Sequence, residues 1–303
     1  ILCMSAQNEN WELIRSAYLV ANLGTVSGAA SRAGVHHATI IRHIDALESN
    51  LGVKLFQRHA RGYVPTEAGR DLLRVATAAG EQFDQLLSRI RGRGAAVSGD
   101  LVVTALSVFS PQITGWLARL QALHPELTTT LIADDRPLRL EYGEAHVAIR
   151  AGNKPAEPDN VVQHLLSADN ALYASADYVE RYGVIRGQDD IANHRFLATT
   201  GSIRRAPYAR WYEENVPPEA IVFRASNISA VADAAKAGIG IMPFSRWSVL
   251  DHPDLVEVMP PQPEWRSDFW LVTHVDLHRS AKVQACLDLF KREARTVSQK
   301  LAG

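Results

Sequence analysis

The sequence predicts a multi-domain α+β protein, and three observations lead to this fold class. Residues 24–69 contain two short amphipathic helical patterns that meet at a glycine and are followed by a basic hairpin. Residues 66–91 contain one long helical pattern, and strands alternate with helices from residue 100 onward. A chain of 303 residues is also long for a single hydrophobic core, so two or three domains are expected.

The composition is that of an ordinary soluble globular protein, with 47% apolar residues, 21% charged residues and a net charge of -1. Residues 1–65 are slightly basic, with six Lys and Arg against four acidic residues, which permits nucleic-acid binding without establishing it. The two cysteines, Cys3 and Cys286, lie far apart, so we expect a cytoplasmic location and no disulfide framework. No apolar run reaches the roughly 18 residues that a membrane span needs, and residues 1–4 lack the pattern of a signal peptide.

Two helices are expected at the start of the chain. The first covers residues 10–23, where apolar side chains recur at helical spacing: Trp11, Ile14, Tyr18 and Ala21. Gly24 ends this helix, and Thr25 offers a hydroxyl N-cap to a second helix over residues 26–33.

A third helix is expected after Gly34, which stands where a helix-turn-helix needs a residue that can take a positive φ. Val35 is expected to pack under this turn. The helix covers residues 37–50, and its buried stripe is predicted to be Ile40, Ile44, Leu47 and Leu51. Its opposite, solvent-facing side carries His37, Ala38, Ile41, Arg42 and Asp45.

The N-terminal part of that outer face is where a helix-turn-helix meets base edges in the major groove. Arg42 could read guanine or hold a phosphate, His37 could donate to a base or phosphate, and Ile41 could touch a thymine methyl group. The alternative for Arg42 is a solvated charge or an ion pair with Asp45.

A wing is predicted next. Residues 52–56 close the helix and lead into a hairpin over residues 57–64 that carries Arg58, His59, Arg61 and Gly62. The tip of such a hairpin lies on phosphates, and the alternative is an ordinary charged turn. The four histidines of this region complete no tetrahedral ligand set, so no metal site is predicted: His36, His37, His43 and His59.

The long helix is expected from Thr66, which can cap it, to Arg91, with an apolar stripe of Leu72, Ala76, Ala79, Phe83, Leu86 and Ile90. At 1.5 Å per residue it would be roughly 39 Å long. Such a helix needs a partner for its stripe, and the same helix of a second subunit is the natural one. The alternative is packing against the chain's own second domain. Residues 91–99 contain three glycines and indicate a hinge.

The remainder of the chain has the strand-helix alternation of a parallel sheet covered by helices. Strands are predicted at residues 101–106, 127–133, 146–150, 168–174, 196–199, 238–242 and 270–273, and helices at 111–123, 228–237 and 281–295. Residues 107–110 are predicted to form a loop between a strand and a helix.

Several short elements of residues 1–65, the head of the chain, and of the segment after it recur together at fixed spacings: the Ala29-Ala30 pair, Ile44-x-x-Leu47-Glu48, Leu51-Gly52-x-x-Leu55-Phe56-x-Arg58, and Thr66-Glu67-Ala68-Gly69. With these elements the head resembles the DNA-binding domain of the LysR-type transcriptional regulators. Val147-Ala-Ile-Arg150 and residues 237–243 extend the resemblance into the remainder of the chain, from residue 100 onward. The family usually opens its recognition helix with Ser-Gln-Pro, where this chain has His36-His37-Ala38, and Ile41 replaces a usual Ser.

The resemblance implies three parts: a winged helix-turn-helix over residues 1–65, a dimerisation linker helix over 66–93, and an effector-binding domain over 94–303. It also implies that the last is a two-lobed α/β domain similar to periplasmic solute-binding proteins, with lobe one at 97–167 and 268–300 and lobe two at 168–267. The implied partners are a double-stranded DNA operator with two-fold character, a small-molecule effector, and further copies of the chain in a dimer or tetramer. RNA polymerase is a further candidate partner.

The DNA-binding candidates are residues of the helix-turn-helix and the wing: Thr25, Ser27, Arg32, His36, His37, Thr39, Ile41, Arg42, Arg58 and Arg61. The effector-binding candidates lie at expected strand ends and helix starts: Ser107, Val108, Phe109, Asp135, Arg150, Thr199, Thr200, Gly201, Asn227 and Ile228. The hydroxyl groups of residues 107–110 and the following helix N-terminus suit a carboxylate or another anion, and Phe109 could stack on an apolar ligand. Alternatively Ser107, Thr200 and Asn227 only cap helices, and Arg150 forms a structural pair.

No enzymatic motif is complete. Gly238-Ile-Gly240 is a lone fragment of a dinucleotide fingerprint, and a Walker motif, HExxH and GxSxG are all missing from the sequence. The sequence therefore predicts a sequence-specific DNA-binding regulator that is no enzyme, has no cofactor and is controlled by an effector of unknown identity. The competing class is an α/β solute-binding or enzymatic protein whose N-terminal domain serves oligomerisation.

Overall fold

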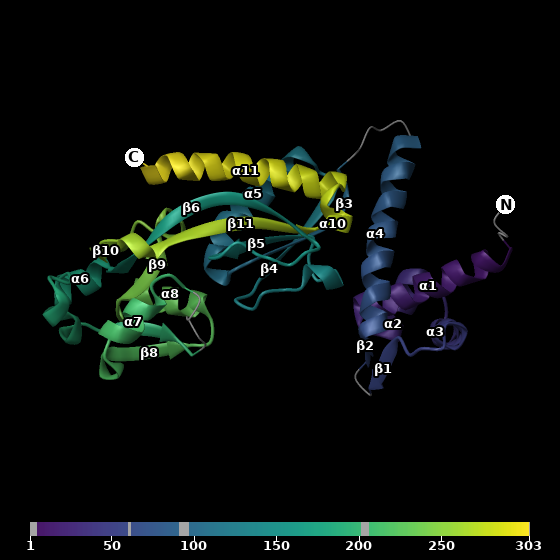
Figure 1. The fold of residues 1–303 in the computed structure, drawn as a ribbon, viewed down its shortest axis with the longest axis horizontal. Coiled ribbons are helices and arrows are strands. Elements are labelled where there is room, and N and C mark those ends of the chain that lie inside the picture. Colours follow the sequence, from purple (N-terminus) through teal and green to yellow (C-terminus); the bar gives the residue numbers. More distant parts are fainter. Residues whose placement is uncertain (1–4, 60–61, 91–96, 201–205, 303) are drawn as a thin grey trace. The chain divides into compact units, whose positions relative to one another are not determined.

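The computed structural model describes residues 5–59, 62–90, 97–200 and 206–302, which form two compact units (Figure 1). The first unit comprises residues 1–96 with 139–144, and the second comprises residues 97–138 with 145–303. Helices and strands both contribute, which confirms the predicted multi-domain α+β class. Most of the predicted hinge at 91–99 and the candidates Arg61 and Gly201 lie outside the described residues. In the part of the chain that the structure describes, no helix is long and apolar enough to cross a membrane.

The first unit is a three-helix head with a hairpin and a long helix. Its elements are α1 (Ser5–Leu23), α2 (Val26–Ala33), α3 (His37–Leu51), β1 (Phe56–His59), β2 (Gly62–Pro65) and α4 (Glu67–Ile90). The predicted order is confirmed, and β1 and β2 form the expected antiparallel hairpin. Gly34 adopts φ +69°, and its N–H contacts the carbonyl groups of Ala30 and Ser31, so the left-handed residue predicted for the turn is present.

The caps of the head helices follow from local side chains. The Thr25 hydroxyl accepts a hydrogen bond from the Gly28 N–H at 3.1 Å, as predicted. The ring of His36 caps α3 by accepting from the Ala38 N–H through Nδ1 at 3.4 Å. The Thr66 hydroxyl accepts from the Gly69 N–H at 3.2 Å and so caps α4.

The head core differs in detail from the predicted stripes. Ile40, Ile44 and Leu47 are buried, but Leu51 is 52% exposed because it is the last residue of α3 and projects beyond the core. Val35 is also exposed, so it does not pack under the turn. Among the described residues of α1, the buried apolar side chains are Ala17, Leu19 and Val20, whereas Trp11 lies at the surface with its ring edge-on to Phe83 of α4 at 5.5 Å.

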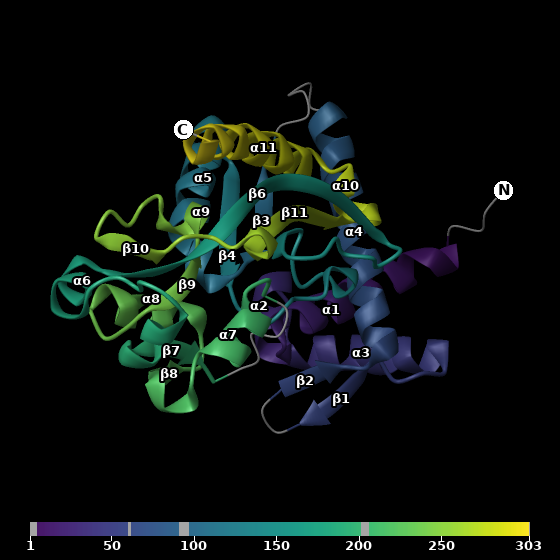
Figure 2. The same ribbon diagram turned by 60° about the vertical axis from the view of Figure 1, so that its left-hand side comes forward.

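The second unit is built on a seven-stranded sheet (Figure 2). Its strands are β3 (Gly99–Ala105), β4 (Leu127–Ala133), β5 (Val147–Ala151), β6 (Asn160–Ser175), β9 (Met242–Ser245), β10 (Leu255–Met259) and β11 (Arg266–His274). β3 is parallel to β4 and β5, but β11 is antiparallel to β5 and β6. The expectation of a parallel sheet was therefore wrong for β11, because this strand returns from the second lobe and enters the sheet in the opposite direction. It was also wrong for β9 and β10, which pair antiparallel with β6.

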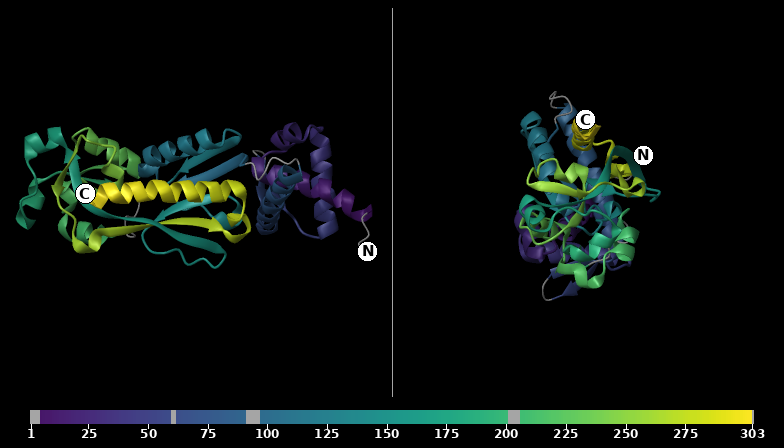
Figure 3. Two further views of the ribbon diagram at one scale, coloured as in Figure 1. Left: turned by 90° about the horizontal axis from the view of Figure 1, so that it is seen from above. Right: turned by 90° about the vertical axis from the view of Figure 1, so that its left-hand side faces the viewer.

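The long strands β6 and β11 run side by side and join two lobes (Figure 3). In lobe one, α5 (Ser110–Leu123) and α11 (Ala281–Ala302) cover the sheet and share one core with it. In lobe two, the cores involve β7 (Phe196–Thr199), β8 (Ile221–Ala225), α6 (Ala176–Tyr182), α7 (Ala209–Asn215) and α8 (Ile228–Lys236). The short helices α9 (Arg246–Val249) and α10 (Val275–His278) complete the unit together with 3-10 turns at Ser107–Phe109, Gln188–Asn193, Pro218–Ala220 and Pro263–Trp265. A further 3-10 turn, Leu140–Tyr142, belongs to the first unit.

Several elements were not predicted. β8 and β10 are short and only partly buried, and α6 and α7 have seven residues each, so their apolar periodicity is weak. Residues 107–109 form a 3-10 turn that leads directly into α5 rather than a loop. The predicted strand at 238–242 begins only at Met242, because Gly238 adopts φ +74° and ends the preceding helical segment.

Candidate functional sites in the two units

The outward face of α3 presents the side chains that were predicted to read DNA. His37, Ala38 and Arg42 are exposed, whereas Ile40 and Ile44 on the other side are fully buried. Ile41 is half-buried and packs against the head core, so it departs from the expectation that it lies on the solvent-facing side. The exposed face of α3 therefore presents the guanidinium of Arg42 and the imidazole of His37 to the solvent.

Arg42 is not paired with Asp45, which was the alternative considered for it. The Asp45 carboxylate instead accepts a hydrogen bond from the Arg58 guanidinium at 2.5 Å. Within the described ranges, no hydrogen bond or ion pair of the Arg42 side chain is found. Its guanidinium is thus available for a phosphate or for the acceptor atoms of a guanine.

Glu48 connects α3 to the wing. Its side chain is 1% exposed, and its Oε1 accepts hydrogen bonds from the Leu55 N–H at 2.9 Å and the Phe56 N–H at 3.2 Å. Its Oε2 accepts from Lys54 Nζ at 2.7 Å and from Arg58 Nη2 at 3.2 Å. Burial alone would raise the pKa of Glu48, but the hydrogen bonds from Lys54, Leu55 and Phe56 outweigh it and hold the pKa below its usual value.

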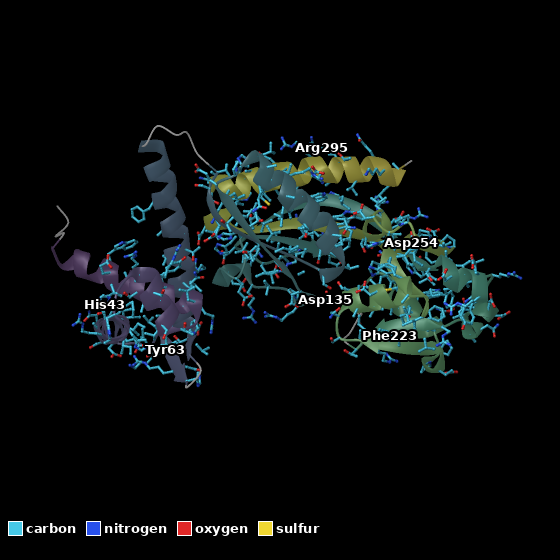
Figure 4. All side chains as sticks on the ribbon, turned by 180° about the vertical axis from the view of Figure 1, so that it is seen from behind. His43, Tyr63, Asp135, Phe223, Asp254 and Arg295 are labelled. Atoms are coloured by element: carbon cyan, nitrogen blue, oxygen red, sulfur yellow. The ribbon has the colours of Figure 1, made fainter. Side chains whose placement is uncertain are left out.

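Arg58 was predicted to contact phosphate from the wing, and in the structure its side chain is 37% exposed and bonds to carboxylates of α3. Its guanidinium bonds to Asp45 and Glu48 and lies 5.4 Å from the centroid of the Tyr63 ring. The hydrogen bond to Asp45 is the main cause that raises the pKa of Arg58. Arg58 therefore holds the wing against α3, and its charge is balanced by Asp45 and Glu48. Its neighbour on the wing, Tyr63, is labelled in Figure 4.

Gly62 fixes the other side of the wing. It adopts φ +144°, and the N–H of the next residue, Tyr63, donates to the Gly24 carbonyl at 3.0 Å. A Cβ atom on Gly62 would lie 2.6 Å from the same Gly24 oxygen. The wing therefore needs a glycine here both for its backbone angle and for its close approach to the turn before α2.

The other DNA-binding candidates surround this face. Ser27 and Arg32 are exposed on α2. Thr25 and His36 are exposed, but each side chain also caps a helix, and Thr39 is half-buried. The structure thus brings the α2 and α3 candidates to one small domain, with the wing attached through Glu48.

In the second unit, Asp135 lies where the two lobes meet (Figure 4). It follows β4 of lobe one, and its Oδ1 accepts hydrogen bonds from the Ser107 N–H at 3.2 Å and the Ser107 hydroxyl at 2.8 Å. Its Oδ2 accepts from the Ile228 N–H at 2.8 Å, at the first turn of α8 in lobe two. Three candidates that are far apart in sequence are therefore in direct contact.

The neighbours of this contact have mixed roles. Val108 packs against the cores of both lobes. Asn227 caps α8 by accepting from the Ala230 N–H at 2.8 Å, which was the alternative considered for it. Thr199 ends β7, and Thr200 follows it. The Thr200 N–H donates to the Ala225 carbonyl at 2.7 Å, so the end of β7 lies beside the segment that leads into α8.

Phe109 needs correction as an effector-binding candidate. It is 4% exposed, and its ring stacks on Trp247 at 4.5 Å and meets Phe269 edge-on at 5.1 Å, so it belongs to the lobe-one core and offers no face to a ligand. The Arg150 guanidinium donates to the Leu138 carbonyl, which is a structural contact of the kind considered as its alternative. A contact of Arg150 with an effector stays a prediction.

Sequence reasoning missed Glu48 and Trp247 as organising residues. The signal for Glu48 was present, since it is an acidic residue directly after the buried Leu47 and one turn after Ile44. Trp247 follows a short strand of lobe two yet is fully buried in the core of lobe one, and nothing in its local sequence indicates that distant partner.

Comparison with known families agrees with this geometry. Residues 11–70 match the family model described as "Bacterial regulatory helix-turn-helix protein, lysR family". Residues 94–295 match the model described as "LysR substrate binding domain", which by itself covers more than half of the chain. The chain belongs to the LysR family. It is therefore a LysR-type transcriptional regulator with a helix-turn-helix DNA-binding domain and a substrate-binding domain, and the resemblance inferred from the sequence is confirmed.

Individual relatives of this LysR-family chain are distant. An HTH-type transcriptional repressor of Pseudomonas aeruginosa strain UCBPP-PA14 is 25% identical over 81% of this chain and 79% of its own length. Full-length OxyR from Pseudomonas aeruginosa has a TM-score of 0.70 at 18% identity, covering 95% of both chains. Full-length LysG from Corynebacterium glutamicum with bound effector Arg has a TM-score of 0.64 at 15% identity, covering 94% of this chain and 98% of its own. The two structures show the shared fold, and the related sequence is that of a regulator and not of an enzyme.

Proposed function

We propose that this LysR-type regulator reads its operator with the exposed end of α3. The observation that carries this proposal is the uncommitted guanidinium of Arg42 on an α3 face whose opposite side is fully buried. His37 lies on the same face, and the wing is held beside it through Glu48. Phosphate contacts would supply affinity, while Arg42 and His37 would add base preference.

Operator binding tests this proposal. The wild-type chain and an Arg42→Ala variant are titrated by fluorescence anisotropy against DNA from the chain's own upstream region at several salt concentrations. Loss of a bidentate base contact of about 1–3 kcal/mol would weaken binding about 5- to 150-fold. The matched control is Arg210→Ala, an arginine of the second unit whose side chain is 88% exposed. Equal binding of Arg42→Ala and wild type, or binding with no preferred sequence, would contradict the proposal.

We also propose that α4 pairs with the same helix of a second subunit. Val75 and Phe83 of α4 are both about half-exposed apolar side chains, which a partner helix would cover. Two heads per dimer would match an operator with two-fold character, from which the dimer would act on RNA polymerase. Sedimentation of Val75→Asp should show a weakened dimer, with Val222→Asp, an exposed valine of β8, as the control. Unchanged association of Val75→Asp would reject this pairing.

The second proposed site is for a small-molecule effector at the junction of the two lobes. The support is the contact from Ser107 and Asp135 of lobe one to Ile228 of lobe two, which a ligand could alter. A ligand that favours one lobe arrangement would change DNA affinity through the coupling between the sites. A thermal-shift screen followed by operator binding with each hit tests this, because a true effector must change both the melting temperature and the DNA affinity. Hits that stabilise the chain without any change in operator affinity would contradict it.

A further inference from the structure

The contact between the lobes is made by a carboxylate that belongs to the chain itself. Asp135 accepts two hydrogen bonds from Ser107 and one from the Ile228 N–H at the start of the nine-residue helix α8. A hydroxyl, a backbone N–H and a helix N-terminus are the donors that commonly bind a ligand's carboxylate or phosphate. In this chain those donors are already occupied by Asp135.

The bonding capacity of Asp135 decides what a ligand can do at this place. An ionised carboxylate has about four acceptor positions. Oδ1 uses two of them for Ser107, and Oδ2 uses one for Ile228. One acceptor position on Oδ2 remains, and the side chain of Asp135 is partly exposed rather than buried.

We propose that Asp135 fills the anion position of the lobe junction and thereby selects an effector that presents an N–H or O–H donor here instead of a carboxylate or phosphate. This inference rests on the proposed effector site and names its ligand chemistry. An anionic group would have to displace the Asp135 carboxylate from Ser107 and Ile228. It would gain only the hydrogen bonds that Asp135 loses. The displaced carboxylate would stay nearby and repel it. The flanking side chains Asp134 and Arg136 are exposed and opposite in charge, so they add no net attraction for an anion.

The same contact links the two lobes without a ligand. Asp135 and Ser107 belong to lobe one, whereas Ile228 belongs to lobe two. A donor group that binds the free acceptor position of Oδ2 would leave this link in place, while an anion at the same place would have to break it. The charge of the effector therefore determines whether the lobe contact is retained.

A rescue experiment tests the proposal without knowledge of the effector. The Asp135→Ala variant removes the internal carboxylate and leaves its donors unoccupied. Melting of the full chain is followed in sodium acetate and in sodium chloride of equal ionic strength. Acetate should raise the melting temperature of Asp135→Ala by about 2–4 °C relative to chloride, at a concentration well above its dissociation constant. The wild type should melt at the same temperature in both salts, because its anion position is filled.

Asp134→Ala is the matched control, since Asp134 is the neighbouring exposed carboxylate and its loss should create no acetate effect. If Asp135→Ala does not fold, Asp135→Ser is the second variant, because its short hydroxyl side chain keeps a polar group at this place and leaves room for acetate. Equal stabilisation of the wild type by acetate would overturn the proposal, and so would a folded variant that does not respond. Because the readout is melting, it is independent of DNA binding, and a failure of operator recognition would be seen separately.

Discussion

Replacing Glu48 by alanine should loosen the wing from α3 and destabilise the head. The alanine would remove the acceptor of two buried backbone donors, the N–H groups of Leu55 and Phe56. Both residues are almost fully buried, at 2% and 4% exposure, so water cannot easily replace the carboxylate. It would also leave Lys54 and Arg58 without one of their acceptors.

The expected loss of stability follows from which oxygen of Glu48 accepts from which donor. Oε1 accepts both backbone N–H groups, and Oε2 accepts both side-chain cations. Each orphaned buried N–H costs about 1–3 kcal/mol, so Glu48→Ala should lower the stability of the head by at least about 2–6 kcal/mol. Glu48→Gln keeps an oxygen at the Oε1 position and loses only the contacts to Lys54 and Arg58. Because the Lys54 side chain is 72% exposed, that loss should be no more than about 2 kcal/mol.

Hydrogen exchange measured by mass spectrometry on peptides that contain Leu55 and Phe56 provides the assay. Glu48→Ala should abolish the protection of these amides, whereas Glu48→Gln should largely retain it. Glu12→Ala, which removes an exposed carboxylate from the head, is the control and should change little. Indistinguishable exchange of the alanine and glutamine variants would refute the reasoning, because it would show that Oε1 does not satisfy the two backbone donors.

Two further predictions concern the head. Because the folded pKa of Glu48 is lowered, its contribution to stability is present above its ordinary pKa of 4.5 and is lost as the pH falls through the folded pKa. When hydrogen-exchange protection is titrated with acid, the wild type should therefore lose protection, and Glu48→Gln should lose less. Identical titration curves of the two proteins would contradict this. Gly69→Ala should destabilise the start of α4 by more than about 1 kcal/mol, since its Cβ would clash with the Leu55 carbonyl oxygen. Gly80→Ala, in open space on the same helix, should stabilise it by about 0.5–1 kcal/mol in thermal melting, and equal effects at the two positions would contradict the steric argument.

The head was predictable because its determinants are local. Gly24, Thr25 and Gly34 end one helix and begin the next within a few residues, and the expected bounds of α2 agree with the structure. The partners of side chains in the head were less predictable from the sequence. The orientation of Arg58, for example, depends on Asp45, which is 13 residues earlier.

The second unit was less predictable because many of its contacts join residues that are far apart in the sequence. The contact of Asp135 with Ile228 joins residues 93 positions apart, and that of Gln112 with the Ser248 carbonyl spans 136 positions. The apolar character of Phe109 was clear from the sequence, but whether its ring faces a ligand or a core depends on Trp247, which arrives from the other lobe. Strand direction is likewise nonlocal, which is why the antiparallel entry of β11 was missed.

The bonding around Glu48 also affects how the affinity of the head for DNA should respond to salt. Lys54 and Arg58 bind Asp45 and Glu48, so these four side chains carry no net charge together. Cations that are already balanced by carboxylates displace few condensed counterions when they approach a phosphate. The slope of log affinity against log salt should therefore be shallower than a count of the basic residues of the head suggests, and it should report mainly on unpaired groups such as Arg42.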